Sequence, residues 1–418
     1  MKASSIKRLT VALFILLALV LLGQILRSPK YFDTSSVGYD ARTRYGEICC
    51  AHQGVNSFRI WNREMTLPGF APLPRPDYEN VSCAPNELKV HAYPPWHTVI
   101  FYWYGWLSMR AYLLFTMIFF WSCIGFIVYE CLRLAKARFK NYGLLVGISL
   151  ALIVYDVEFC FCSLNYSIFI LALILLMNKA LEEKHEILAG LAWAVIMMKP
   201  QIGLLFVWPL FWRRHYLTIV TAILTCLAGT VITSFIVHDS VIDLILQIPQ
   251  IGWPYPKGVI TEKIFRPFLG ERASIVVMGL FFILTGFVTW FLRKNRDFLV
   301  CCIPVIFIIP VWTYSITYDR VVLLPAYLFL LGQISKVYKL GGRGIIKWYY
   351  CATAIFLAVW TFLSWQNLIS FVPGEKILYI LFKSERFLEW AVSIIVFLVL
   401  LFRKEFEPKR EGGSAAEI

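Results

Sequence analysis

Charged residues are scarce in this chain of 418 residues. Asp, Glu, Lys and Arg make up 16% of the sequence, whereas soluble globular domains average about 25%. Apolar residues make up 59% and the mean hydropathy is +0.68, so there is too little polar surface to cover a soluble body. The composition therefore excludes an ordinary soluble enzyme and predicts an all-α polytopic membrane protein.

Metal-binding and disulfide patterns are also missing from the sequence. Its 11 cysteines and 6 histidines include no CxxC pair and no zinc-type Cys/His spacing. His91 and His97 lie close together, but no third ligand is near them in the sequence, so we expect no metal and no cofactor. Cys83 could form a disulfide with Cys49 or Cys50 if their shared loop faces an oxidising compartment.

Basic residues outnumber acidic ones by 40 to 26, which gives a net charge of +14. Such an excess can indicate nucleic-acid binding, but here the basic residues occur as short clusters between apolar runs and form no continuous stripe. We interpret the clusters as topology signals and expect no nucleic-acid partner. They fall in alternate loops, which predicts that both termini are cytoplasmic.

Long apolar runs dominate the sequence, and a run of roughly 17 to 25 residues can cross a membrane. The sequence predicts a bundle of about twelve transmembrane or half-length helices. The candidate segments are 9–26, 109–132, 142–156, 163–178, 187–198, 201–212, 216–237, 273–292, 298–314, 321–335, 348–365 and 387–402. No small-residue cleavage site follows the first segment, so we expect it to be an uncleaved anchor.

The segments 187–198 and 201–212 are each too short to cross a membrane alone. Lys199-Pro200 interrupts what would otherwise be one long helix, because proline disrupts helix interiors. We therefore predict two short helices that meet at a break on the outer side. This arrangement also keeps the basic Arg213-Arg214 pair on the inner side.

The predicted organisation is a single integral domain, 1–418, in the cell (inner) membrane. The first outer loop, 27–108, contains the aromatic cluster Tyr102-Trp103-Tyr104 and Trp106. Such clusters lie at the headgroup level, so we expect interfacial helices in this loop. The other extramembrane segments are a second outer loop, 238–272, and a cytoplasmic tail, 403–418.

Ionisable residues near the outer helix ends are candidates for chemistry, because a charge at a membrane boundary is costly to desolvate. Asp40 could deprotonate an acceptor hydroxyl as a general base, or it could cap a helix or pair with Arg44. Lys199 could bind a phosphate, or it could extend to the interface. Arg320 could bind a phosphate while Asp319 orients it, or the two could form an internal pair.

Several short motifs follow one another in a characteristic order over about 9–340. They are Asp40 and Tyr45 soon after the first apolar run, the Tyr93-Pro94-Pro95 bend, Asn165 before a short helix, Lys199-Pro200-Gln201, and Tyr318-Asp319 at the start of a late helix. In this order and spacing the chain resembles the C-type (GT-C) glycosyltransferases, most closely the polyprenol-phosphate-mannose-dependent mannosyltransferases of glycosyltransferase family 87. It departs from the family at Ser163-Leu164, where the family usually has Gly-Gln before the Asn.

The resemblance implies a GT-C-like bundle that moves a hexose such as mannose from a polyprenyl-phosphate carrier to a lipid-linked or envelope glycan acceptor. The transfer takes place on the outer face of the membrane and inverts the sugar configuration, with Asp40 as general base. Lys199 and Arg320 are then expected to bind the donor phosphate. The expected substrate-lining residues are Tyr45, Tyr93, Asn165, Gln201, Tyr318 and Asp319.

Two other functions fit the same composition. One is a secondary transporter or flippase of lipid-linked sugars, since broken helices and buried ions also mark transport sites. The other is an envelope polysaccharide polymerase or ligase. Transport is less consistent with the sequence, because the charged candidates collect at the outer boundary and the apolar runs carry few ionisable groups near their centres.

Overall fold

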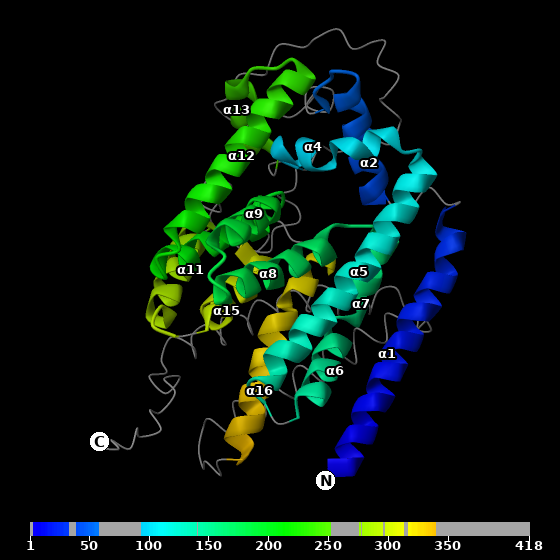
Figure 1. Ribbon diagram of the computed structural model, residues 1–418, viewed down its shortest axis with the longest axis vertical. Coiled ribbons are helices and arrows are strands. Elements are labelled where there is room, and N and C mark those ends of the chain that lie inside the picture. The colour runs from blue at the N-terminus through cyan, green and yellow to red at the C-terminus, as the bar shows by residue number, and fades with distance from the viewer. Residues whose placement is uncertain are drawn as a thin grey trace.

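The computed structural model describes residues 3–32, 39–57, 93–139, 141–251, 276, 278–295, 297–312 and 317–339. Within these ranges every regular element is a helix (Figure 1), which confirms the predicted all-α class. The possible disulfide cannot be placed, because Cys83 lies outside the described residues. The predicted segments 348–365 and 387–402 and the tail 403–418 also lie outside them.

The described helices follow one another along the chain from Ala3 to Lys339. Their bounds are α1 (Ala3–Phe32), α2 (Tyr39–His52), α4 (Trp96–Phe101), η1 (Tyr102–Trp106), α5 (Met109–Lys136), α6 (Tyr142–Leu152), α7 (Val154–Ser163), α8 (Ser167–Glu182), α9 (Glu186–Ile196), α10 (Pro200–Gly203), η2 (Leu204–Phe206), α11 (Val207–Trp212), α12 (Tyr216–Val237), α13 (Val241–Ile251), an unlabelled helix Met278–Leu292, α15 (Phe298–Trp312), η4 (Thr317–Leu323) and α16 (Leu324–Lys339).

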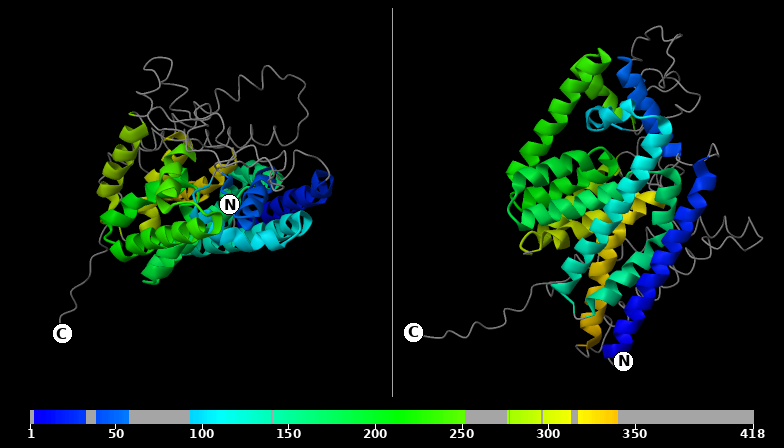
Figure 2. Two further views of the ribbon diagram at one scale, coloured as in Figure 1. Left: turned by 90° about the horizontal axis from the view of Figure 1, so that it is seen from above. Right: turned by 45° about the vertical axis from the view of Figure 1, so that its right-hand side comes forward.

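The longer helices form an inclined bundle. Helix α6 packs against α1, α5 and α16, while α8 lies between α5 and α9, and α9 packs against α12 (Figure 1). The short elements α2, α4, η1 and α13 lie together over one end of this bundle (Figure 2), and we call them the cap. The first predicted outer loop therefore contains the short helices α2, α4 and η1, and their location at the membrane interface stays a prediction.

Two of the described helices are long and apolar enough to cross a membrane, α5 and α12. They correspond to the predicted segments 109–132 and 216–237. The shorter apolar helices of the described chain are Tyr142–Leu152, Glu186–Ile196, Pro200–Trp212, Met278–Leu292 and Phe298–Ile309. A bilayer core of about 30 Å needs about 20 helical residues, and within the described ranges these helices are shorter than that. The number of about twelve segments stays a prediction.

The interruption predicted at Lys199-Pro200 is confirmed. Helix α9 ends at Ile196 and α10 begins at Pro200, whose ring is suited to the first helical position. Lys199 is extended, with φ −108° and ψ 84°, as expected for a residue before proline. Glu186 Oε1 at the start of α9 lies 3.2 Å from His215 Nδ1 after α11. The start of α9 and the end of α11 therefore lie at the same end of the bundle.

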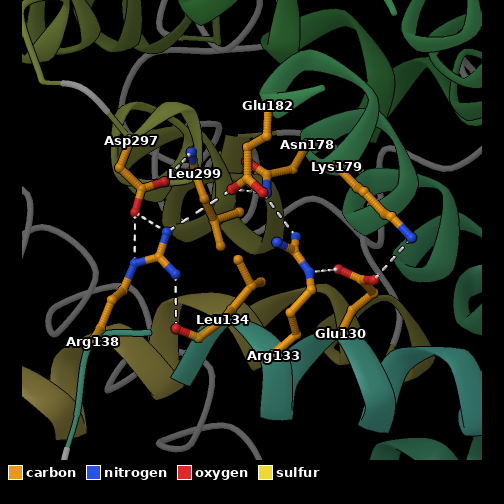
Figure 3. Close-up of polar contacts among 9 residues, drawn as sticks. All are labelled: Glu130, Arg133, Leu134, Arg138, Asn178, Lys179, Glu182, Asp297 and Leu299. Carbon is orange, nitrogen blue, oxygen red and sulfur yellow. Dashed lines mark hydrogen bonds and ion pairs between the residues drawn. The ribbon is translucent and has the colours of Figure 1, made fainter. Parts of the chain in front are cut away.

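An ion-pair network joins α5, α8 and the start of α15 (Figure 3). It consists of Glu130, Arg133, Arg138, Lys179, Glu182 and Asp297. Glu130 is fully buried, and it accepts a hydrogen bond of 2.7 Å from Arg133 Nε. A buried carboxylate needs such compensation, so the network fixes how α5 lies against α8.

Replacing Gly190 with alanine tests the contact between α9 and α12. A Cβ atom at Gly190 would lie 2.6 Å from Thr221 Cβ and 2.7 Å from the Thr218 carbonyl oxygen, so a helix must shift. We expect Gly190→Ala to reduce the free energy of unfolding by about 1–3 kcal/mol and to lower the apparent Tm of the purified protein in detergent. Gly125→Ala in α5 is the control, because a Cβ atom there meets nothing within 4 Å; equal Tm values would contradict the packing.

Candidate active site

Polar side chains from four separate segments meet where the cap joins the bundle. Asp40 is in the first turn of α2, Asn165 and Ser167 lie at the start of α8, Lys199 precedes α10, and Asp319 is in η4. Hydrogen bonds connect all of them. We call this group the Asp40 cluster.

Asn165 is the central member of the Asp40 cluster. Its Nδ2 donates to Asp40 Oδ2 at 2.8 Å, while its Oδ1 accepts from Lys199 Nζ at 2.6 Å and from the Ser167 backbone N at 3.0 Å. Lys199 Nζ also donates to Ser167 Oγ and to Asp319 Oδ1, each at 2.6 Å. Ser167 Oγ lies 2.7 Å from both Asn165 Oδ1 and Asp319 Oδ1.

The members of the cluster differ in their access to solvent. The side chains of Lys199 and Asp319 are 3% and 1% exposed, and Ser167 and Asn165 are buried as well. Asp40 is half-buried. A buried charge is tolerated when it is paired and hydrogen-bonded, as Lys199 and Asp319 are. Asp40 is therefore the member of the cluster with the greatest access to solvent.

The chain turns sharply just before Asn165. Leu164 adopts a left-handed conformation with φ 50° and ends α7, and Asn165 N donates to Cys160 O at 3.0 Å. This is the arrangement that glycine usually takes after a helix. Leu164 is 3% exposed, so its buried side chain compensates for the backbone strain. The departure from the family pattern at Ser163-Leu164 thus lies in the turn that presents Asn165.

Tyr93 and Arg44 contact each other next to the Asp40 cluster. Arg44 Cζ lies 4.7 Å from the centre of the Tyr93 ring, and Tyr93 stacks on His97 with 4.6 Å between ring centres. Arg44, the alternative partner considered for Asp40, forms an ion pair with Glu47. Burial raises the pKa of the Tyr93 hydroxyl well above its usual value, and the charges of Arg44, Asp40 and Asp319 affect it more weakly. Tyr93 is thus neutral and close to the cluster.

The structure brings together some of the predicted site residues and separates one. Asp40, Asn165, Lys199 and Asp319 are in hydrogen-bonded contact, with Tyr93 beside them. Tyr45 points elsewhere, because its hydroxyl donates to Leu107 O at 2.5 Å. Burial raises the pKa of Tyr45 to about 12.

The remaining predicted residues lie close to the cluster in sequence. Arg320 follows Asp319 in η4 and is 5% exposed. Gln201 is half-buried in α10, two residues after Lys199. The backbone of Tyr318 is in η4, but its side chain lies outside the described part of the chain.

Ser167 is the member of the cluster that the sequence analysis missed. The signal was present as Asn165-Tyr166-Ser167 directly before an apolar helix, since Asn commonly hydrogen-bonds the backbone at the start of a helix. Among the described residues, no group of three or more His, Cys, Asp or Glu side chains could hold a metal ion.

Comparisons with known proteins identify the family. The family model for glycosyltransferase family 87 matches residues 91–312, which is more than half of the chain. The matched range contains Asn165, Ser167 and Lys199 of the cluster. No curated protein and no solved structure matches the chain. The chain therefore belongs to glycosyltransferase family 87 and is a membrane glycosyltransferase.

Proposed function

We propose that the protein transfers a hexose, such as mannose, from a polyprenyl-phosphate carrier to a hydroxyl group of a lipid-linked or envelope glycan acceptor. We place the reaction on the outer face of the membrane, at the junction of cap and bundle. The observation that carries the proposal is the half-buried carboxylate of Asp40, held by a buried polar cluster at the start of α8. It is the accessible group in the cluster that can accept a proton.

The reaction is a single displacement that inverts the sugar. The acceptor oxygen attacks the anomeric carbon, its proton passes to Asp40, and the bond between that carbon and the phosphate oxygen breaks. General-base catalysis requires a group that is unprotonated at the working pH. Burial raises the pKa of Tyr93 and of Tyr45, so neither hydroxyl serves as the base, and Asp40 does.

The leaving polyprenyl phosphate gains negative charge and needs a cation. Arg320 is the better candidate, because a guanidinium can donate two parallel hydrogen bonds to a phosphate. Lys199 has three N–H groups, and these already donate to Asn165, Ser167 and Asp319. Lys199 would have to release one of them to bind the phosphate.

The prenyl chain of the donor needs an apolar surface. Helix α12 exposes a row of large apolar side chains: Leu217, Val220, Ile223, Leu224, Leu227, Ile232 and Phe235. Its opposite side packs against α9 and α4. This exposed apolar face of α12 supports a donor that arrives from the bilayer.

Replacing Asp40 with asparagine tests the general base. The variant keeps the shape of the side chain but cannot accept a proton, and general-base catalysis contributes roughly 10²–10⁴-fold. We expect kcat to fall at least about 100-fold. The assay measures transfer of label from radiolabelled polyprenyl-phosphate mannose to a lipid extract of cells that lack the gene, with purified protein in detergent.

Asp243→Asn is the matched control for this experiment. Asp243 also lies in the first turn of a cap helix, α13, and none of the cluster's hydrogen bonds among the described residues involves it. We expect wild-type activity from the control. An Asp40→Asn protein that folds normally and transfers sugar at the wild-type rate would remove Asp40 from the mechanism.

Replacing Arg320 with glutamine tests the donor phosphate site. If Arg320 binds the phosphate, the donor KM rises about tenfold or more, whereas the acceptor dependence changes little. Arg110→Gln is the control, because Arg110 is an exposed residue at the start of α5. The same assay with GDP-mannose tests the donor class: transfer from the soluble nucleotide sugar at a similar rate would contradict a polyprenyl-phosphate donor.

A further inference from the structure

Asn165 separates the accessible carboxylate from a buried ion pair. On one side its Nδ2 holds Asp40, and on the other its Oδ1 contacts Lys199, which is paired with Asp319. We propose that Asn165 is the positioning residue of Asp40, and that Lys199 contributes to catalysis by fixing the orientation of Asn165. This inference rests on the proposed function, because it assigns a role relative to Asp40 as general base.

The charges around Asn165 leave its amide one favourable orientation. A side-chain amide has an acceptor oxygen and a donor NH₂ group, which differ little in shape. In the present orientation the oxygen faces the Lys199 ammonium and the Ser167 N–H, and the NH₂ group faces the Asp40 carboxylate. The reverse orientation would place donor against donor on one side and oxygen against carboxylate on the other.

The ion pair between Lys199 and Asp319 stabilises this orientation of the Asn165 amide. Asp319 Oδ1 lies 2.6 Å from Lys199 Nζ, and the Lys199 side chain is only 3% exposed, so each group compensates for the burial of the other. Because the surroundings exclude water, the contact between Lys199 and Asn165 Oδ1 is stronger than it would be in solvent. Asp319 therefore holds the Lys199 ammonium in place as a hydrogen-bond donor to Asn165 Oδ1.

The consequence for Asp40 is that one carboxylate oxygen is held and the other is available. Asn165 binds Oδ2, and no hydrogen bond from another described residue reaches Oδ1. A base whose orientation is fixed in advance needs no reorganisation when the acceptor arrives. The geometry points to Oδ1 as the atom that takes the acceptor proton.

The alternative role for Lys199, direct binding of the donor phosphate, makes different kinetic predictions. A residue that positions the base changes kcat and leaves the donor KM nearly constant. A residue that binds the donor phosphate changes the donor KM, and its loss adds to the loss caused by any change at Asn165. The two roles can thus be separated without a structure of the complex.

The first test is Asn165→Asp, which keeps an oxygen toward Lys199 and Ser167 but replaces the NH₂ donor that faces Asp40. We expect kcat to fall at least about tenfold, with the donor KM for polyprenyl-phosphate mannose within about twofold of wild type. Asn178→Asp is the matched control. Asn178 is also buried and also donates to a carboxylate, Glu182 Oε1 at 3.0 Å, at the far end of α8, and we expect its kcat to be unchanged.

The second test removes both charges of the ion pair, because a single replacement would leave an unpaired buried charge. We expect Lys199→Met/Asp319→Leu to lower kcat about tenfold with the donor KM within about twofold of wild type. In an Asn165→Ala protein the same double replacement should lower kcat no further, since the pair acts through Asn165. Ser167→Ala, which removes one hydroxyl and keeps the backbone N–H, provides a milder variant if the double one does not fold.

Each outcome separates this inference from the proposed function. A tenfold rise of the donor KM in the Lys199→Met/Asp319→Leu protein would overturn the positioning role. A further tenfold fall of kcat when this double replacement is added to Asn165→Ala would also overturn it. Wild-type kcat in folded Asn165→Asp, together with inactive Asp40→Asn, would also overturn it and leave Asp40 as the base. Wild-type activity in Asp40→Asn would instead overturn the proposed function itself.

Discussion

The buried ion pair between Lys199 and Asp319 is the interaction on which the site depends. Each charge alone would be prohibitively costly among apolar helices, so the segments that carry them must meet. The break before α10 delivers Lys199, η4 delivers Asp319, and the start of α8 supplies Ser167 and Asn165 as hydrogen-bond partners. Asn165 in turn donates a hydrogen bond to Asp40, so the position of these segments also sets the position of Asp40 at the start of α2.

Interrupted helices are the second constraint. The chain stops α7 at Leu164 and α9 at Ile196, and in both places it exposes polar groups within an apolar bundle. Backbone that is not helical is tolerated in such surroundings only where protein or a cavity satisfies it. Asn165 follows the first interruption and Lys199 lies in the second, and Lys199 Nζ donates a hydrogen bond to Asn165 Oδ1. The breaks thus supply the polar groups and bring them together.

Much of this could be predicted from the sequence, and the reasons differ by residue. Asp40, Lys199 and Asp319 stood out because ionisable groups are rare in apolar surroundings, and Pro200 marked the break. Tyr45 could not be excluded, because the rotation of α2 depends on its contact with Leu107 far along the chain. Ser167 was missed because serines also occur in apolar helices for structural reasons. The family model matches residues 91–312, a range that contains the Tyr93, Asn165 and Lys199 motifs but not Asp40 or Asp319.

The two ends of α8 show why similar groups serve different purposes. At about 1.5 Å per residue, the 16 residues of α8 separate the Asp40 cluster from the ion-pair network by about 24 Å. In the network, Glu130 is fully buried beside Arg133 and Lys179, so its charge serves packing. At the other end Lys199 and Asp319 neutralise each other, and the additional carboxylate of Asp40 keeps access to solvent. A carboxylate that is partly open and held on one side is suited to accept a proton.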